Sequence, residues 1–153
     1  MTSARPARLL AFDPRDRPLA RAVVELWRRS FEHGVGILDP NPIEAQLEYF
    51  DSTLVPAHRV VTAWNESGLV GFVAYTPESV GALYVAVPQL GRGIGTQLLE
   101  LARDESAGSL WLYTFARNAR ARAFYERRGF VDVGHGFENM WQLEDVRYEW
   151  RRS

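Results

Sequence analysis

The chain has 153 residues, 46% of them hydrophobic, which is enough for one domain with a proper core and too little for two. Its 18 basic and 19 acidic residues leave a formal net charge of −1, so no overall field would draw it to nucleic acid or to an anionic membrane. The absence of cysteine excludes a disulfide framework, a thiolate zinc site and a cysteine nucleophile, and the cytoplasm is the expected location.

Metal sites and membrane spans are not expected either. His33, His58 and His135 are far apart in the sequence, and none has the spacing of a metal-ligand motif. No apolar run reaches the length of about 18 residues that a membrane-spanning helix needs.

The first half of the chain predicts a strand, two helices and three more strands. "ARLLAF" at residues 7–12 is typical of a strand, and the prolines and aspartates after it favour a turn and a helix start. Apolar residues then recur at helical spacing over 19–31 and 43–54, with a loop rich in glycine and proline between them. The spacing of apolar residues then changes to one that predicts three strands joined as hairpins, at 58–65, 69–76 and 81–88.

The second half begins with a glycine-rich segment and alternates helices and strands. We expect helices at 93–107 and 118–128, with the strand "SLWLYTF" at 109–115 between them and two β segments near 129–134 and 145–151. An antiparallel first half followed by a β-α-β unit predicts an α+β or mixed α/β fold.

The glycine-rich segment is "LGRGIGTQLL", with Gly91, Gly93 and Gly95 at the start of a helix. Bare backbone at a helix N-terminus suits either a tight turn or a site for a phosphate group. A Walker loop is excluded because the chain has no lysine. A dinucleotide fingerprint is disfavoured because Thr96 stands at its third glycine position and no carboxylate lies in 109–115.

A second motif follows downstream, in "NARARAFYERRGF". It supplies Asn118, Ala121, the pair Phe124 and Tyr125, and then Gly129 with Phe130. Together with "LYVAVPQLGRGIGTQLL", this spacing resembles the GCN5-related N-acetyltransferase (GNAT) family. The resemblance runs from about residue 60 to residue 130 in the order of elements.

The resemblance implies one GNAT-like acetyltransferase domain over residues 1–153. Its fold would be a central mixed sheet of about seven strands with about four helices, in which the fourth and fifth strands splay apart. Acetyl-CoA would be the cosubstrate, with no metal. Its pantetheine arm would pair with the backbone of Leu83, Tyr84 and Val85, and Asn118 would cap the short helix and also bond this arm.

The pyrophosphate of the cosubstrate would rest on backbone amides of the glycine-rich segment. The residues concerned are Gly91, Arg92, Gly93, Ile94, Gly95 and Thr96. One departure from the family pattern is Leu90, which stands where Gln or Arg is usual, so that one polar contact is missing or is replaced by Gln89. Arg117, Arg120 and Arg122 lie close enough in sequence to reach the 3′-phosphate, although a solvated helix face is the more common place for such residues.

Tyr125 is the residue that the resemblance assigns to chemistry. Its phenol would protonate the departing thiolate as a general acid, while its ordinary structural role would be that of a core aromatic. The general base is open between Glu32, His33, Glu78 and water, because no carboxylate lies on the strand before the glycines.

The acceptor would be a primary amine of a small molecule or peptide, attacking the thioester directly in a ternary complex. Segments 33–40 and 134–150 would wall its pocket, with Phe31, Tyr75, Phe137 and Trp141 as aromatic residues that could face it. The alternative is a catalytically idle module that binds acyl-CoA on the same fold. The sequence leaves the oligomeric state open, a homodimer included.

Overall fold

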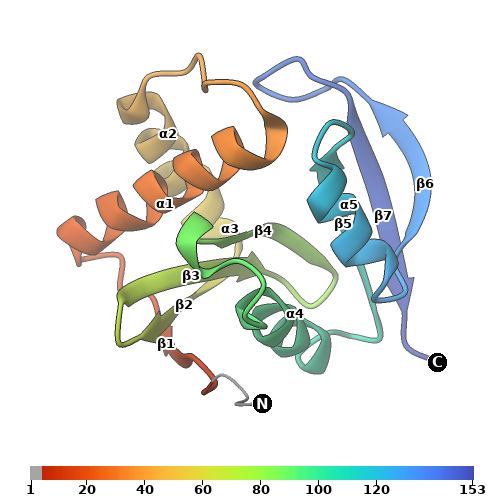
Figure 1. The fold of residues 1–153 in the computed structure, drawn as a ribbon, viewed down its shortest axis with the longest axis horizontal. Helices are drawn as coiled ribbons and strands as arrows, with labels where there is room; N and C mark the ends of the chain where they lie inside the picture. Colours follow the sequence, from red (N-terminus) through yellow and green to blue (C-terminus); the bar gives the residue numbers. More distant parts are fainter. Residues whose placement is uncertain (1–4) are drawn as a thin grey trace.

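Seven strands form one mixed sheet in the computed structural model, which describes residues 5–153 (Figure 1). The predicted fold class is confirmed. In chain order the elements are β1 (Arg8–Ala11), α1 (Arg17–Val35), α2 (Ile43–Tyr49), the π-helical turn η1 (Phe50–Leu54), α3 (Val55–Ala57), β2 (Arg59–Asn65), β3 (Gly68–Tyr75), β4 (Ser79–Val85), the 3₁₀ turn η2 (Val87–Gln89), α4 (Ile94–Asp104), β5 (Ser109–Phe115), α5 (Ala119–Glu126), β6 (Val131–Gly136) and β7 (Asp145–Arg151).

The strands lie in the order β1-β2-β3-β4-β5-β7-β6, and every neighbouring pair is antiparallel except β4 and β5. The parallel pair is joined only at Ser79 with Trp111 and at Val80 with Leu112. Beyond these pairs the two strands diverge, and we call this divergence the splay. It is the feature expected between the fourth and fifth strands.

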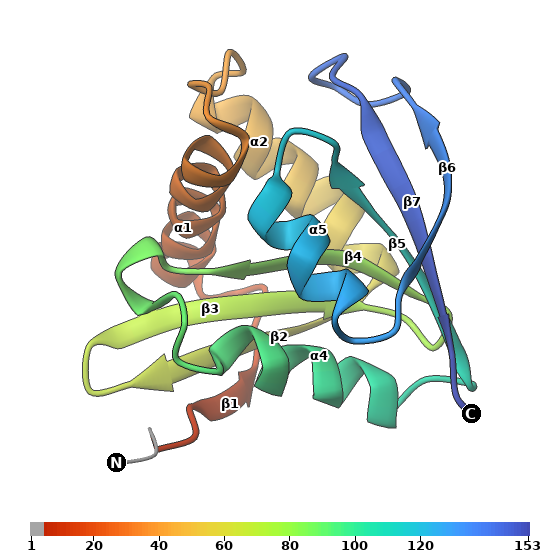
Figure 2. The same ribbon diagram turned by 45° about the vertical axis from the view of Figure 1, so that its right-hand side comes forward.

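Two cores lie on the two faces of the sheet. The first contains the buried face of α4 together with Tyr125 of α5, and the second contains the buried face of α1 together with Phe50 and Leu54 of η1. Figure 2 shows α1 and α4 on opposite sides of the strands β2, β3 and β4. The helices therefore hold the sheet from both faces and leave the splay between them.

Helix α1 is longer than the predicted 19–31 because its ends are capped. The carboxylate of Asp16 accepts a hydrogen bond from the Leu19 amide at 3.1 Å, and Gly36, at φ 83°, ends the helix in the left-handed region. Within the helix, Gly34 leaves room for Asn118, because an ideal Cβ on Gly34 would lie 2.5 Å from Asn118 Nδ2. This contact brings the end of α1 to the start of α5.

No helix in residues 5–153 is both long enough and apolar enough to cross a membrane. The same part of the chain holds no group of three or more His, Asp or Glu side chains arranged to take a metal ion.

Candidate active site

A cavity of about 560 Å³ opens at the splay. Its walls come from β4, the end of α1, the glycine-rich segment with the start of α4, β5 and α5. The predicted site residues on these walls are Leu83, Tyr84, Val85, Gly91, Gly93, Ile94, Gly95, Thr96, Asn118 and Tyr125. The structure therefore brings the two sequence motifs together in one cavity. Arg92 is the exception, since it is exposed and lies outside this lining.

The edge of β4 that faces the cavity has lost its partner strand. On its other side β4 keeps its antiparallel pairing with β3, for example between Leu83 and Val73. After Val80 no residue of β5 pairs with it. Backbone groups on a free strand edge can pair with an extended ligand as a further strand would.

The glycine-rich segment turns into α4 through left-handed backbone. Gly91 has φ 81° and Gly93 has φ 85°, a region that residues with a Cβ rarely adopt. No side chain caps α4 at Gly93, so the first amides of the helix are open to a ligand. Gly95 is needed for close packing, because an ideal Cβ there would lie 3.3 Å from Phe124 of α5. An open helix N-terminus of this kind suits an anion.

Arginines of α5 and its C-terminal end add positive charge to the cavity. Arg120, Arg127 and Arg128 line it, whereas Arg117 and Arg122 do not. The guanidinium of Arg128 donates to Thr96 Oγ1 at 2.6 Å and lies 3.9 Å from the centre of the Phe124 ring. Burial lowers the pKa of Arg128 from its ordinary value. Sequence reasoning missed Arg128, although its place four residues after Phe124, at the end of a predicted helix, was a signal for it.

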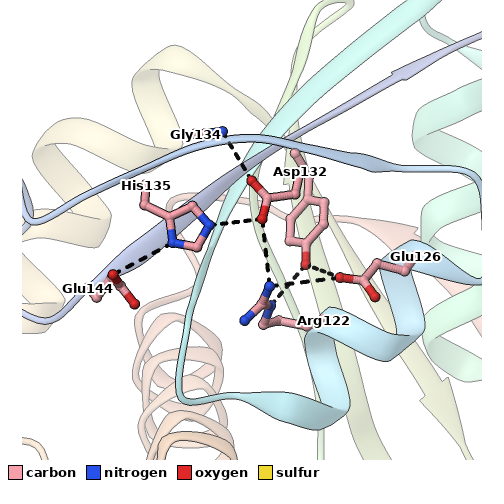
Figure 3. A network of polar contacts seen from close by, with 7 residues as sticks. Arg122, Glu126, Asp132, Gly134, His135 and Glu144 are labelled. Carbon is pink, nitrogen blue, oxygen red and sulfur yellow. Dashed lines mark hydrogen bonds and ion pairs between the residues drawn. The ribbon is translucent and has the colours of Figure 1, made fainter.

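Arg122 belongs to a polar network on the far side of α5 (Figure 3). Its Nε donates to the Tyr148 hydroxyl at 3.0 Å, and its guanidinium pairs with Asp132 at 3.6 Å. Asp132 also accepts from His135 at 2.8 Å. The network ties α5 to β6 and β7, and Arg122 is thereby directed away from the cavity.

Leu90 has no polar side-chain group, so it cannot make the contact to the cosubstrate that Gln or Arg would make at this position. Leu90 packs, partly buried, against the core that contains α4. The neighbouring Gln89 does not replace it, because its amide is bonded to Asn65 at 3.0 Å and to Ser67 at 3.3 Å. The expectation that Gln89 replaces the missing contact is therefore wrong, since its side-chain amide is hydrogen-bonded to residues at the turn between β2 and β3.

Tyr125 is buried, with 7% of its surface exposed, and it reaches the cavity. Its ring packs edge to face on Phe124 at 5.1 Å and on Phe130 at 5.5 Å between centroids. No hydrogen bond from another group of residues 5–153 contributes to the shift in its pKa. Burial raises the pKa of this phenol above its ordinary value of 10, so it carries its proton at neutral pH. A neutral phenol facing a cavity can donate a proton there.

Only one of the three predicted base residues lines the cavity, and it is His33. Glu32 accepts from the Asp39 amide at 2.8 Å and pairs with Arg28 at 3.8 Å. Glu78 is exposed in the turn between β3 and β4. Among the described residues no Asp or Glu lines the cavity, so a carboxylate base is not at hand.

The aromatic residues expected around an acceptor do not all gather. Phe31 lines the cavity and stacks on Trp141 at 5.1 Å between centroids. Phe137 is 61% exposed, and the hydroxyl of Tyr75 is bonded to Glu105, away from the cavity. Segment 33–40 contributes His33, Gly34 and Val35 to the lining, whereas no residue of 134–150 lines the cavity, so the expectation that this second segment walls the pocket is not met.

Solved structures share this architecture. The solution structure of apo YjaB from Escherichia coli superposes with a TM-score of 0.77 at 19% identity, covering 97% of this chain and all of the other. The PaiA N-acetyltransferase of Thermoplasma acidophilum, solved in complex with coenzyme A, superposes with a TM-score of 0.69 at 17% identity, covering 96% of this chain and 99% of the other. At these identities the likeness shows the fold.

Sequence comparison shows the family. The model of the acetyltransferase (GNAT) family matches residues 20–130. The peptidyl-lysine N-acetyltransferase YjaB of Salmonella typhimurium is 32% identical over 113 residues, which are 73% of this chain and 77% of that protein. The chain therefore belongs to the GNAT family of acetyltransferases.

Proposed function

We propose that the protein transfers the acetyl group of acetyl-CoA to a primary amine, by direct attack of the amine on the thioester in a ternary complex. The observation that carries the proposal is that the parted edge of β4, the glycine-rich segment and Tyr125 line one cavity. The coenzyme A complex of PaiA, which has the same fold, supports the choice of cosubstrate.

The cosubstrate would lie along the cavity in an extended form. Its pantetheine arm would pair with the backbone of Leu83, Tyr84 and Val85, where β5 has left the edge of β4 free. Its pyrophosphate would meet the amides of residues 91–96 at the start of α4, with Arg120 and Arg128 supplying charge. Asn118 caps α5 by accepting from the Ala121 amide at 3.1 Å, and its Nδ2 would bond the arm.

The transfer needs a proton donor for the sulfur. The nitrogen lone pair forms a bond to the thioester carbon, and collapse of the tetrahedral intermediate breaks the carbon–sulfur bond. Tyr125 would protonate the leaving sulfur, since its phenol is neutral and reaches the cavity. The proton that the nitrogen loses passes to solvent, solvent returns a proton to Tyr125, and the products are an N-acetylated amine and coenzyme A.

The acceptor that we would test first is a lysine side chain in a peptide. The relative from Salmonella typhimurium is named a peptidyl-lysine N-acetyltransferase, and this supports the choice. Phe31, which lines the cavity and is stacked on Trp141 behind it, offers an apolar surface that suits a lysine stem. A primary amine on a small molecule is the other acceptor class.

Titration calorimetry with acetyl-CoA, followed by thiol release over a panel of amines, tests the proposal. The panel holds a lysine-containing peptide with a blocked N-terminus, the same peptide with arginine for lysine, and a small polyamine. We expect saturable binding of acetyl-CoA and release of coenzyme A that depends on a primary amine. Absence of saturable binding would overturn the proposal.

A further inference from the structure

Helix α5, which carries Tyr125, has little apolar surface to hold it in place. It has eight residues, about two turns, and of these residues only Tyr125 is buried. A helix this short is marginal by itself, so tertiary contacts determine where it lies. The position of the Tyr125 phenol in the cavity therefore depends on the contacts that α5 makes with the rest of the fold.

The two ends of α5 are fixed by contacts with other helices. At the N-terminal end, Asn118 caps α5 and meets Gly34 of α1. Just beyond the C-terminal end, Arg128 donates to Thr96 Oγ1 of α4 at 2.6 Å. These contacts join α5 to the helices that cover the two faces of the sheet. A further contact joins the middle of α5 to the sheet itself.

Tyr148 of β7 makes this contact. Its side chain is completely buried, and its ring lies 6.2 Å from that of Tyr125 between centroids. Its hydroxyl donates to Glu126 Oε2 at 2.6 Å and accepts from Arg122 Nε at 3.0 Å. Burial raises the pKa of Tyr148, so the hydroxyl keeps its proton at neutral pH and stays the donor to the carboxylate.

The two partners of this hydroxyl flank Tyr125 along the helix (Figure 3). Arg122 and Glu126 are four residues apart, so they are neighbours on one face of α5. Tyr125 follows Arg122 by three residues and directly precedes Glu126. One hydroxyl on β7 thus binds the turn of α5 that carries the proposed proton donor.

The residues that make this contact are separate from the cavity. Arg122 is held in turn by Asp132 of β6, whose carboxylate lies 3.6 Å from its guanidinium. Neither Tyr148 nor Arg122 nor Glu126 lines the cavity. Within the turn 122–126, Tyr125 is the residue with a polar side chain in the lining. An effect of the hydroxyl on acetyl transfer would therefore act through the position of Tyr125.

Resting on the proposed function, we propose that Tyr148 is a positioning residue for Tyr125, the proton donor of acetyl transfer. Its two hydrogen bonds hold the turn 122–126 of α5 against β7, so that the Tyr125 phenol stays within reach of the leaving sulfur. General acid catalysis needs the donor at hydrogen-bond distance from the group that it protonates. A displacement of α5 by one helical rise, about 1.5 Å, would move the phenol out of this range.

Tyr148→Phe tests the proposal, because it keeps the ring and removes both hydrogen bonds. With the best amine of the panel we expect kcat to fall by about tenfold, less than for removal of the Tyr125 hydroxyl itself. The dissociation constant for acetyl-CoA is expected to stay at the wild-type value, since Tyr148 lies outside the cavity lining. At the exposed position 126, Glu126→Ala is expected to lower kcat too, and Glu126→Gln, which keeps an acceptor for the hydroxyl, to restore it.

Thr62→Val is the matched control for lost stability. Thr62 of β2 is buried, and its hydroxyl also makes one bond as donor, to the Leu10 carbonyl at 3.0 Å, and one as acceptor, from Trp64 Nε1 at 2.8 Å. It lies outside the cavity lining, in the part of the sheet that does not contain β7. We expect both variants to lower the Tm, and Thr62→Val to keep the wild-type kcat below its unfolding transition. Equal losses of kcat in the two variants would overturn the positioning role.

A double-mutant cycle with Tyr125→Phe shows whether Tyr148 acts through Tyr125. If it does, Tyr148→Phe has no further effect on kcat once the Tyr125 hydroxyl is gone, so the two losses are not additive in free energy.

Three results would contradict the assignment. Additive losses, or a folded Tyr148→Phe with the wild-type kcat, would show that Tyr148 does not position Tyr125, while the proposed function stands. An unchanged kcat in Tyr125→Phe would remove the roles of both tyrosines and leave acetyl transfer in place. A wild type that turns over no amine would overturn the proposed function, and the role of Tyr148 with it.

Discussion

At the scale of single residues, the phenol of Tyr125 lines the cavity and has a pKa raised by burial, with no hydrogen bond to residues 5–153 among the causes, and both facts favour a chemical role. Replacement by phenylalanine keeps the ring contacts with Phe124 and Phe130. We therefore expect Tyr125→Phe to lower kcat by about 10²-fold and to change the free energy of unfolding by less than about 1 kcal/mol. Steady-state kinetics and urea denaturation measure the two quantities.

Tyr113→Phe is the matched control for this change. Tyr113 also lines the cavity, but it is half exposed and its hydroxyl is 3.5 Å from Arg147. We expect its removal to leave kcat near the wild-type value. Equal losses in the two variants would mean that the Tyr125 hydroxyl is not the proton donor.

His135 on β6 is a residue whose charge contributes to stability rather than to chemistry (Figure 3). Its hydrogen bond to Asp132 raises the pKa of His135 above the ordinary 6.5 and lowers the pKa of Asp132 below the ordinary 3.8. The stabilisation from His135 is complete below pH 6.5 and is lost as the pH rises through the raised pKa. The stabilisation from Asp132 is lost as the pH falls through the lowered pKa.

His135→Gln should therefore lower the Tm most between about pH 4 and 6.5, and hardly at all in alkaline solution. Both groups are exposed, so the difference in Tm is expected to be small and to shrink with added salt. Thermal unfolding followed by circular dichroism across this pH range measures it. A difference in Tm that is the same at every pH would contradict the prediction.

At the scale of elements, the start of α4 depends on Gly93 in left-handed backbone at φ 85°. Gly93→Ala would strain this turn by about 1–2 kcal/mol and shift the amides that would meet the pyrophosphate. A hydrogen bond to a charged group contributes about 1.5–3 kcal/mol, so losing one weakens acetyl-CoA binding by about tenfold or more. Titration calorimetry measures the dissociation constant.

Gly108→Ala is the control for this change, because Gly108 also has a positive φ but lies in another part of the fold. It has φ 118° and open space around it, and it lies between α4 and β5, outside the cavity lining. Gly108→Ala is expected to destabilise the fold by a similar amount without changing the dissociation constant. If both variants weaken binding equally, the effect arises from lost stability rather than from the start of α4.

At the scale of the whole molecule, the splay divides the sheet into two parts, β1–β4 and β5–β7–β6. Only two residue pairs join them by backbone pairing. An extended arm paired with β4 would add a strand to the free edge. Acetyl-CoA at about 100 times its dissociation constant would then stabilise the fold by about 2.7 kcal/mol.

Hydrogen exchange would show which backbone amides acetyl-CoA protects. We expect acetyl-CoA to slow exchange most at those amides of residues 81–85 that are not already bonded to β3, because the arm would accept from them. Strand β2, which is paired on both sides, serves as the internal control. Protection that rises equally in β2 and β4 would contradict pairing at the edge of β4.

Much of this fold follows from local pattern. The change from helical to alternating period at residue 58 predicts the hairpins, and the two motifs around Gly93 and Tyr125 predict the walls of the cavity. The contact of Gly34 in α1 with Asn118 could not be predicted, because it joins residues that are far apart in the sequence. The π-helical turn at 50–54 is not visible either, since its apolar spacing fits an ordinary helix.

The candidate site was harder to predict where contacts are distant in sequence. Arg122 is close in sequence to the predicted cosubstrate site, but it is bonded to Tyr148 of β7 and paired with Asp132 of β6, contacts that local spacing does not encode. Gln89 stands beside the glycine-rich segment and is nevertheless bonded to the turn between β2 and β3. Adjacency along the chain is a poor guide where a loop changes direction.

The short pairing of β4 with β5 also affects the expected rate of acetyl transfer. The cosubstrate arm would be held by β4 in the first part of the sheet, whereas Tyr125 packs against Tyr148 in the second part. A slip of one residue between β4 and β5 would displace these groups by about 3.3 Å, and a misplacement of about 1 Å already costs about 10²-fold in rate. The alignment of the thioester with its proton donor therefore depends on two residue pairs between these strands, Ser79 with Trp111 and Val80 with Leu112.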